Sequence, residues 1–174
     1  MTTVLTARLS LAPLDRSLAE HLVCGTPRPR DRWGPGYPDD GDRAGARRFL
    51  RLLAEDGDPG PFGAYEIRVR EDGVAIGGAG FHGPANAAGR VTVGFGLIPA
   101  ARGRGYAAEA LRALLDHARA HGARGVDGDA DRENVASQRV MAAAGMRFLR
   151  EDDRLCHHAV TWPIADPTGP GRTR

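Results

Sequence analysis

The stretch VTVGFGLIPAARGRGYAAEAL, residues 91–111, reads as a strand, a glycine-rich turn and the start of a helix. Apolar residues alternate along the strand and share one face, while Gly94 and Gly96 lie on the other face. Glycines at alternate strand positions indicate a bulge or a close approach of a ligand to the backbone. Pro99 ends the strand, and an amphipathic helix is expected over about Gly105–Ala120. A glycine-rich turn that opens a helix is typical of sites that bind phosphate groups.

The turn at residues 102–108 permits three interpretations, of which the first two are a turn without a ligand and a dinucleotide-binding site. It can be a glycine-rich turn without a ligand, because the chain contains 24 glycines. Read as GxGxxA, with Gly103, Gly105 and Ala108, it resembles a dinucleotide-binding fingerprint, and Asp127 lies where a ribose-binding acid is expected. However, too few residues follow Asp127 for the remaining βαβ units, and tight turns between the preceding strands predict antiparallel pairing.

The third interpretation is RxxGxA, with Arg102, Gly105 and Ala107. Successive N–H groups of residues 103–107 then point into one concavity, to which the helix N-terminus adds partial positive charge. Arg102 and Arg104 can add charge-assisted hydrogen bonds, so the site suits a pyrophosphate. If the preceding strand splays from its neighbour, an extended ligand with amide groups, such as pantetheine, can pair with its backbone.

The composition indicates one globular domain. A core-forming pattern covers residues 1–162 of the 174, and the tail at 163–174 is expected to be poorly ordered. All 24 basic residues are arginines, which excludes a lysine Schiff base and a P-loop lysine. A net charge of +2 without a basic cluster gives no indication of nucleic-acid binding. Without an apolar run of membrane-spanning length or a signal peptide, a cytoplasmic protein that is not in a membrane is expected.

Helices and strands alternate along the rest of the chain in an irregular order. We expect helices over residues 15–23, 42–56, 105–120 and 134–145, and a long loop over residues 24–42. We expect strands within residues 3–11, 62–72, 73–83, 90–98 and 121–130, followed by a closing hairpin over residues 146–162. A mixed sheet with helices on its faces follows from this order.

With these motifs the chain resembles the GCN5-related N-acetyltransferase (GNAT) superfamily. The resemblance rests on residues 91–111 and on DADRENVASQRVMAAAGMRF, residues 129–148, which contains an N-x-x-S helix motif. LTARLSLAPL (5–14) and GGAGFHGP (77–84) are similar to the branch of the ribosomal-protein N-terminal acetyltransferases. The resemblance covers roughly residues 4–162. It implies an α/β (α+β) fold whose mostly antiparallel sheet has six to seven strands, about four helices on its faces, and a splayed, bulged central strand.

The resemblance also implies acetyl-CoA as the donor and an amine as the acceptor. The backbone at Leu97 and Ile98 would hold pantetheine and the thioester, and Asn134 would contact the pantetheine arm. Asn134 is equally well explained as a helix N-cap. The residues that would bind the pyrophosphate are Arg102, Gly103, Arg104, Gly105, Tyr106 and Ala107.

The catalytic residues are less well defined by the resemblance. Thr92 stands where the branch often has a glutamate, and Met141 stands where many acetyltransferases have an acidic tyrosine. Ser137 matches the serine of N-x-x-S to which the role of acid is assigned; alternatively it packs against the cofactor or bonds to its own helix. His82 is the second candidate, as a general base or acceptor contact, unless it only stabilises a turn.

For the acceptor, the resemblance points to the long loop and the first helices. Trp33 and Tyr37 in that loop, together with Tyr65, are the candidate acceptor-binding residues, although loop packing also explains the first two. A peptide N-terminus or a small-molecule amine fits as acceptor, and the chain is expected to be a monomer or a homodimer. No metal site is expected, because the Asp127–Asp131 segment does not fit a calcium loop. A catalytically degenerate module that binds or senses acyl-CoA is the alternative function.

Overall fold

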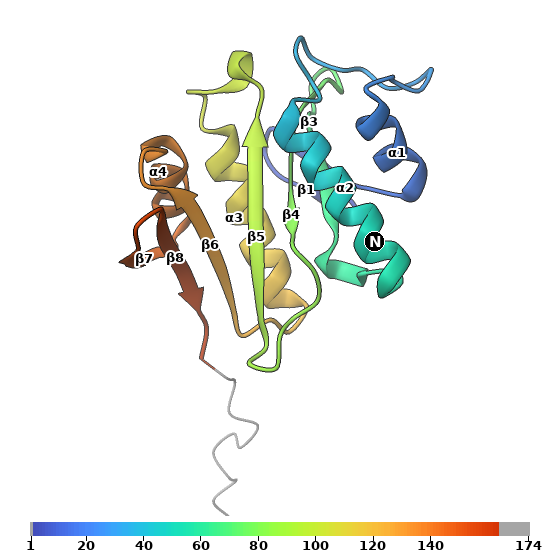
Figure 1. The fold of residues 1–174 in the computed structure, drawn as a ribbon. Helices are drawn as coiled ribbons and strands as arrows, with labels where there is room; N and C mark the ends of the chain where they lie inside the picture. The colour runs from blue at the N-terminus through green and yellow to red at the C-terminus, as the bar shows by residue number, and fades with distance from the viewer. Residues whose placement is uncertain (1, 164–174) are drawn as a thin grey trace, which may run out of the picture.

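The computed structural model describes residues 2–163 and contains one sheet between helices (Figure 1). Its eight strands follow the order β1-β2-β3-β4-β5-β6-β8-β7. The strands are β1 (Val4–Leu5), β2 (Leu9–Pro13), β3 (Ala64–Val69), β4 (Ala75–Phe81), β5 (Arg90–Leu97), β6 (Gly125–Asp131), β7 (Arg147–Glu151) and β8 (Leu155–Thr161). The helices are α1 (Arg16–Cys24), α2 (Asp40–Glu55), α3 (Tyr106–Ala120) and α4 (Val135–Ala144), with short 3₁₀ turns η1 (Gly60–Phe62) and η2 (Pro99–Ala101). The predicted class, a mixed α/β fold with a mostly antiparallel sheet, is confirmed.

The helices lie on both faces of the sheet. Tyr65 of β3 contacts His117 of α3, whereas Asp42 of α2 lies over Gly78 of β4. Alternate residues of a strand point to opposite faces, so α2 and α3 cover opposite sides of β3–β5. On the side of α3, Met141 of α4 packs against Gly128 of β6. The apolar core is therefore divided between two layers, one under α1 and α2 and one under α3 and α4.

Strands β5 and β6 separate along their length, as Figure 1 shows. They pair in parallel only from Arg90↔Gly125 to Thr92↔Asp127, and the other ladders of the sheet are antiparallel. The expected splay is therefore present. The expected bulge in β5 is not, because the β4–β5 register stays constant from Phe81↔Val93 to Gly77↔Leu97. The gap arises from divergence of two regular strands and needs no inserted residue.

The N-terminal segment differs from the prediction of one strand over residues 3–11. It forms a small hairpin of β1 and β2, because Thr6 closes a turn: its hydroxyl accepts the N–H of Leu9 at 2.9 Å. This hairpin brings the sheet to eight strands instead of six to seven. The predicted tail lies, from residue 164 onward, outside the described residues. Within residues 2–163, no helix is both long and apolar enough to cross a membrane.

The start of α2 is fixed by its own side chains. Asp39 caps the helix by accepting the N–H of Asp42 at 3.0 Å, and the Asp42 carboxylate accepts the N–H of Asp39 at 3.0 Å. This reciprocal capping box holds Asp42 in the first helical turn. Only its Oδ2 atom is used there, so Oδ1 remains available to the space between α2 and the sheet.

Candidate active site

The loop at residues 102–108 presents a row of free backbone donors. No acceptor within residues 2–163 takes the N–H groups from Gly103 to Ala108, and the first bond of α3 runs from Glu109 N–H to Gly105 O. Gly103 and Gly105 have φ angles of 74° and 78°, which turn the loop so that consecutive N–H groups converge. The partial positive charge of the α3 N-terminus adds to them, which makes this loop a suitable anion site.

Two arginines hold the loop in place. Arg102 Nε donates to Leu97 O at 2.9 Å, which ties the loop to the end of β5. Arg8, which the sequence did not single out, donates to Arg104 O at 2.9 Å and stacks on the Tyr106 ring at 4.6 Å. The loop is thus braced from β5 and from the N-terminal hairpin.

Glu109 in the first turn of α3 completes this brace. It accepts hydrogen bonds from Thr6 Oγ1 at 2.6 Å and from Arg8 N at 2.8 Å, and it forms an ion pair with Arg8 at 2.7 Å. Desolvation opposes ionisation, but the bonds from Thr6 and Arg8 outweigh it and lower the pKa of Glu109. The carboxylate therefore stays ionised and keeps Arg8 at the edge of the loop.

The gap beside β5 contains unpaired backbone groups. His82 N donates to Thr92 O, and Ile98 N donates to Ile76 O, so even-numbered residues of β5 bond to β4. The backbone groups of Phe95 and Leu97 therefore point the other way, where β6 has already diverged. Leu97 O accepts Arg102, whereas the N–H groups of Phe95 and Leu97 face the gap without a ladder partner. The buried side chains of Leu97 and Ile98 fix this part of the backbone.

Asn134 and Ser137 lie across the gap, where β6 leads into α4. The Asn134 side chain accepts the N–H of Ser137 at 3.1 Å. Asn134 is therefore the N-cap of α4, which is one of the two roles expected from the sequence. Its amide nitrogen makes no bond within the described residues. Ser137 is half-buried and its hydroxyl is likewise free there.

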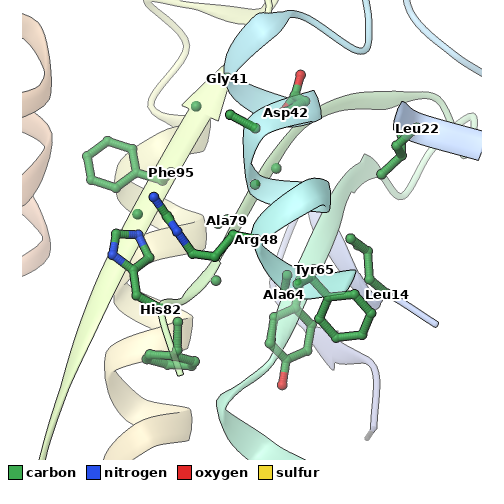
Figure 2. A pocket seen from close by; sticks show the side chains of 18 of the residues that line it. Leu14, Leu22, Gly41, Asp42, Arg48, Ala64, Tyr65, Ala79, His82 and Phe95 are labelled. Carbon is green, nitrogen blue, oxygen red and sulfur yellow. The ribbon is translucent and has the colours of Figure 1, made fainter. Parts of the chain in front are cut away.

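A cavity of about 320 Å³ lies on the opposite face, between α2 and the sheet (Figure 2). We call it the α2 cavity. Gly78, Gly80, Gly94 and Gly96, two facing pairs on β4 and β5, form its base, the glycine floor. A Cβ atom at Gly96 would meet nothing within 4 Å, so this part of the floor is open. Leu14, Leu22 and Phe49 line the walls with apolar side chains.

Asp42 is the carboxylate of the α2 cavity. Its free Oδ1 lies 3.0 Å from the position of a Cβ atom on Gly78, next to Gly96 across the ladder. The pKa of Asp42 is raised to about 7, mainly by burial. The nearby charges of Asp39 and Glu66 contribute to this increase, and the bond from Asp39 N–H opposes it. The sequence placed Asp42 only at the start of the expected helix over residues 42–56, which carries no information about a cavity.

His82 and Arg48 lie at the other side of the glycine floor, as Figure 2 shows. A Cβ atom at Gly94 would be 2.7 Å from His82 Nε2, so the ring covers this glycine. Desolvation and the Arg48 charge lower the pKa of His82, while Asp129 opposes them. The imidazole is therefore neutral near pH 7 and can accept a proton.

The three residues expected at the acceptor site have separate positions. Tyr37 is buried and lines the α2 cavity. The buried Tyr65 side chain points to the α3 face of the sheet, where its hydroxyl bonds to Pro61 O at 3.1 Å and His117 Nε2 at 3.2 Å. Trp33 does not line the cavity. It packs edge-on against Tyr37, with ring centroids 5.6 Å apart, and so supports the wall from behind.

Glu66 is a buried carboxyl that the sequence analysis missed. It is 1% exposed on β3, directly across the ladder from Gly78, and it forms an ion pair with Arg68. Burial raises its pKa, although Arg68 opposes this effect. Its Oε1 atom has no hydrogen-bond partner within the described residues. The alternation of residues along β3 could not reveal the burial of Glu66. It places Glu66 on one face of the strand but does not show whether that face is covered.

A loop of free N–H donors thus follows a splayed strand, and a cavity lies on the far face of the sheet. Residues 8–147 match the family model described as "Acetyltransferase (GNAT) domain". This match covers most of the chain, which therefore belongs to the GNAT acetyltransferases. Among curated proteins, none matches the chain significantly.

Solved structures share the fold. An acetyltransferase from Agrobacterium tumefaciens is 25% identical, with a TM-score of 0.66 over 93% of this chain and 95% of that one. The ribosomal-protein-S5-alanine acetyltransferase from Vibrio fischeri is 14% identical, with a TM-score of 0.66 over 92% and 97%. A microcin C7 self-immunity acetyltransferase in complex with acetyl-CoA and AMP is 10% identical, with a TM-score of 0.63 over 90% and 94%.

Proposed function

We propose that this chain is an acetyl-CoA-dependent N-acetyltransferase that acts on a primary amine. The observation that carries the proposal is the row of free N–H groups from Gly103 to Ala108 at the end of a splayed strand. Family membership and a neighbour described as a complex with acetyl-CoA support the choice of donor. The acceptor type, a small amine or a peptide N-terminus, comes from the chemistry of the α2 cavity.

The residues present fit acetyl-CoA. The 102–108 loop would bind the pyrophosphate through its backbone donors, with Arg102 and Arg104 adjacent. The free N–H groups of Phe95 and Leu97 would pair with the amide-bearing arm, as an added strand does. Asn134 and Ser137 would contact it from the opposite side of the gap. When bound, acetyl-CoA supplies an acetyl group activated as a thioester.

On the acceptor side, Asp42 is the group we assign to proton removal. An incoming ammonium must lose a proton before its nitrogen can attack, and a base with a pKa near the working pH does this well. Asp42 Oδ1 takes that proton; the N–C bond then forms as the thioester C–S bond breaks, and the nitrogen loses a second proton. The products are an N-acetyl amide and a free thiol, with one proton on the thiol and one released.

The two residues expected to be catalytic retain proposed roles. His82 lines the same cavity as a neutral ring and would contact the acceptor. Ser137 would donate a proton to the leaving sulfur. Replacement of Ser137 by Ala tests this role, because loss of the acid lowers kcat while acetyl-CoA affinity remains.

The assignment of Asp42 is tested by the pH dependence of kcat. Asp42→Asn keeps an acceptor for the capping bond but removes the base, so kcat should fall by roughly 10²-fold or more and the acidic limb near pH 7 should disappear. Asp39→Asn still caps the helix. It removes a charge that raises the pKa of Asp42, so the limb should move to lower pH. Asp40→Asn, an exposed change in the same turn, is the control. An unchanged limb in Asp42→Asn would refute the assignment.

The alternative is a module that binds acyl-CoA without turnover, which the absence of glutamate at Thr92 and tyrosine at Met141 favours. Both functions predict that acetyl-CoA raises the melting temperature. Only the enzyme releases free thiol with a panel of amines that includes peptide N-termini, polyamines and amino acids. Stabilisation without thiol release across this panel would favour the sensing module.

A further inference from the structure

The α2 cavity carries opposite charges at its two sides. Asp42 enters from the first turn of α2, and Arg48 enters six residues later, about 9 Å further along the helix axis. Arg48 extends toward His82 and Phe95, on the other side of the glycine floor from Asp42 (Figure 2). A ligand between them meets a proton acceptor on one side and a guanidinium on the other.

Arg48 has no partner of its own. It is half-buried in the wall of the α2 cavity, yet no carboxylate or carbonyl within the described residues lies within bonding distance of its guanidinium. A guanidinium in this position gains from an anion, because charge-assisted bonds are strong where water is partly excluded. His82 beside it is neutral near pH 7 and does not compete for that anion.

The Asp42 side of the cavity has a surplus of carboxyl groups. Glu66 lies beneath it, and burial raises the pKa of both carboxyls. The charge of Glu66 also raises the pKa of Asp42. Asp39 adds a further negative charge, and the Tyr37 hydroxyl also faces this side. Arg68 pairs with Glu66 and Asp31 and forms no ion pair with Asp39 or Asp42 within the described residues. A positively charged group that enters here relieves the repulsion. The ammonium of the acceptor therefore belongs on this side, and an anionic group belongs at Arg48.

The size of the cavity limits the acceptor. A volume of about 320 Å³ is at the low end of the range for ligand sites, which is roughly 300–1,000 Å³. A molecule the size of an amino acid fits within it, with an apolar body against Leu22 and Phe49. A multi-ring amine does not.

We propose that the acceptor is a small zwitterion, an ω-amino acid, whose amine meets Asp42 and whose carboxylate meets Arg48. This inference rests on the proposed function and names the substrate class of the same site. Asp129 could counteract the preference of Arg48 for an anion. This exposed carboxylate of β6 also influences His82, whose pKa it raises. If Asp129 determined the preference, a diamine would bind better than an amino carboxylate.

Binding and turnover should be measured with three matched probes of increasing chain length: ω-amino carboxylates, the corresponding alkylamines, and the corresponding diamines. Calorimetry on the protein alone reports binding without turnover, and thiol release with acetyl-CoA reports transfer. We expect the amino carboxylates to bind at least roughly tenfold more tightly than either other series. Arg48→Gln should remove this preference, raising KM for amino carboxylates with little change for alkylamines. Arg47→Gln, exposed on the same helix, should change neither.

The outcomes separate the two proposals. Calorimetric binding that prefers amino carboxylates and is lost in Arg48→Gln, without thiol release, would support the inference and refute the enzyme. Turnover of alkylamines, diamines or peptide N-termini at least as good as that of amino carboxylates, unchanged in Arg48→Gln, would overturn the inference and keep the enzyme. Tighter binding of diamines that is lost in Asp129→Asn would overturn the inference in favour of Asp129.

Discussion

Glu109 links the N-terminal hairpin to the first turn of α3 and thereby positions Arg8 beside the 102–108 loop. Its carboxylate is largely buried and accepts bonds from Thr6 and Arg8. A depressed folded-state pKa means that this stabilisation is fully present above the ordinary value of 4.5. It is lost as the pH falls through the folded-state pKa.

Glu109→Gln is therefore expected to lower the free energy of unfolding by about 1–2 kcal/mol at pH 7. The difference from the unmodified chain should shrink as the pH falls below 4.5 and the native carboxylate becomes protonated. Urea titrations at a series of pH values measure this difference. Glu20→Gln, on an exposed face of α1, serves as the control. A difference that stays constant with pH would show that packing, not charge, connects Glu109 to the hairpin.

The distance along the chain between interacting residues explains which residues the sequence could predict. Asn134 and Gly145 were predicted as the ends of a helix, because capping depends on residues within one turn. Asp42 and Arg48 were not predicted as site residues. Their roles depend on the glycine floor of β4 and β5, thirty or more residues away in the chain. A capping aspartate and a helical arginine are also common on exposed helices, so neither has a local signal.

At the scale of elements, α3 has a glycine in the left-handed region just outside each of its ends. Gly105 precedes the helix with φ 78°, and Gly122 follows it with φ 85°. A side chain at either position is strained by roughly 1–2 kcal/mol. Only Gly105 lies in the loop whose N–H groups we assign to the pyrophosphate.

The two glycines provide a matched pair of variants. Gly105→Val and Gly122→Val should lower the melting temperature by similar amounts, because the backbone strain is similar. Only Gly105→Val should lose the stabilisation by coenzyme A, since a side chain there moves the loop or blocks close approach of an anion. Thermal unfolding with and without coenzyme A measures both effects. Retained coenzyme A affinity in Gly105→Val would refute the pyrophosphate assignment.

The glycines of β5 illustrate which structural features the sequence pattern of a strand can predict and which it cannot. The resemblance predicted a splayed central strand, and this is correct, because β5 pairs with β6 only up to Thr92. The bulge was inferred from the same glycines and is wrong. Gly94 and Gly96 instead face Gly80 and Gly78 across a regular ladder and form the base of a cavity. A glycine has several structural uses, and only the partner strand decides among them.

For the whole molecule, the sheet behaves as two parts that meet at a short junction. Strands β1–β5 form one part and β6–β8 the other, and their pairing is limited to residues 90–92 of β5. Arg90 reinforces this junction: it donates to Asp127 at 2.6 and 2.8 Å and to Thr161 Oγ1 at 2.9 Å. The width of the gap beyond Thr92, where we place the pantetheine arm, depends on this contact.

Arg90→Gln should therefore affect both stability and cofactor affinity. Loss of these partly exposed bonds should lower the free energy of unfolding by about 1 kcal/mol. A wider or more variable gap should weaken acetyl-CoA binding several-fold, so a higher acetyl-CoA concentration is needed for the same rise in melting temperature. Arg150→Gln on the exposed edge strand β7 controls for the loss of an arginine. If Arg90→Gln lowers stability but leaves the acetyl-CoA titration unchanged, the junction supports the sheet without setting the gap. Loss of affinity in Arg90→Gln alone would show that strand pairing at residues 90–92 determines cofactor binding at residues 95–108.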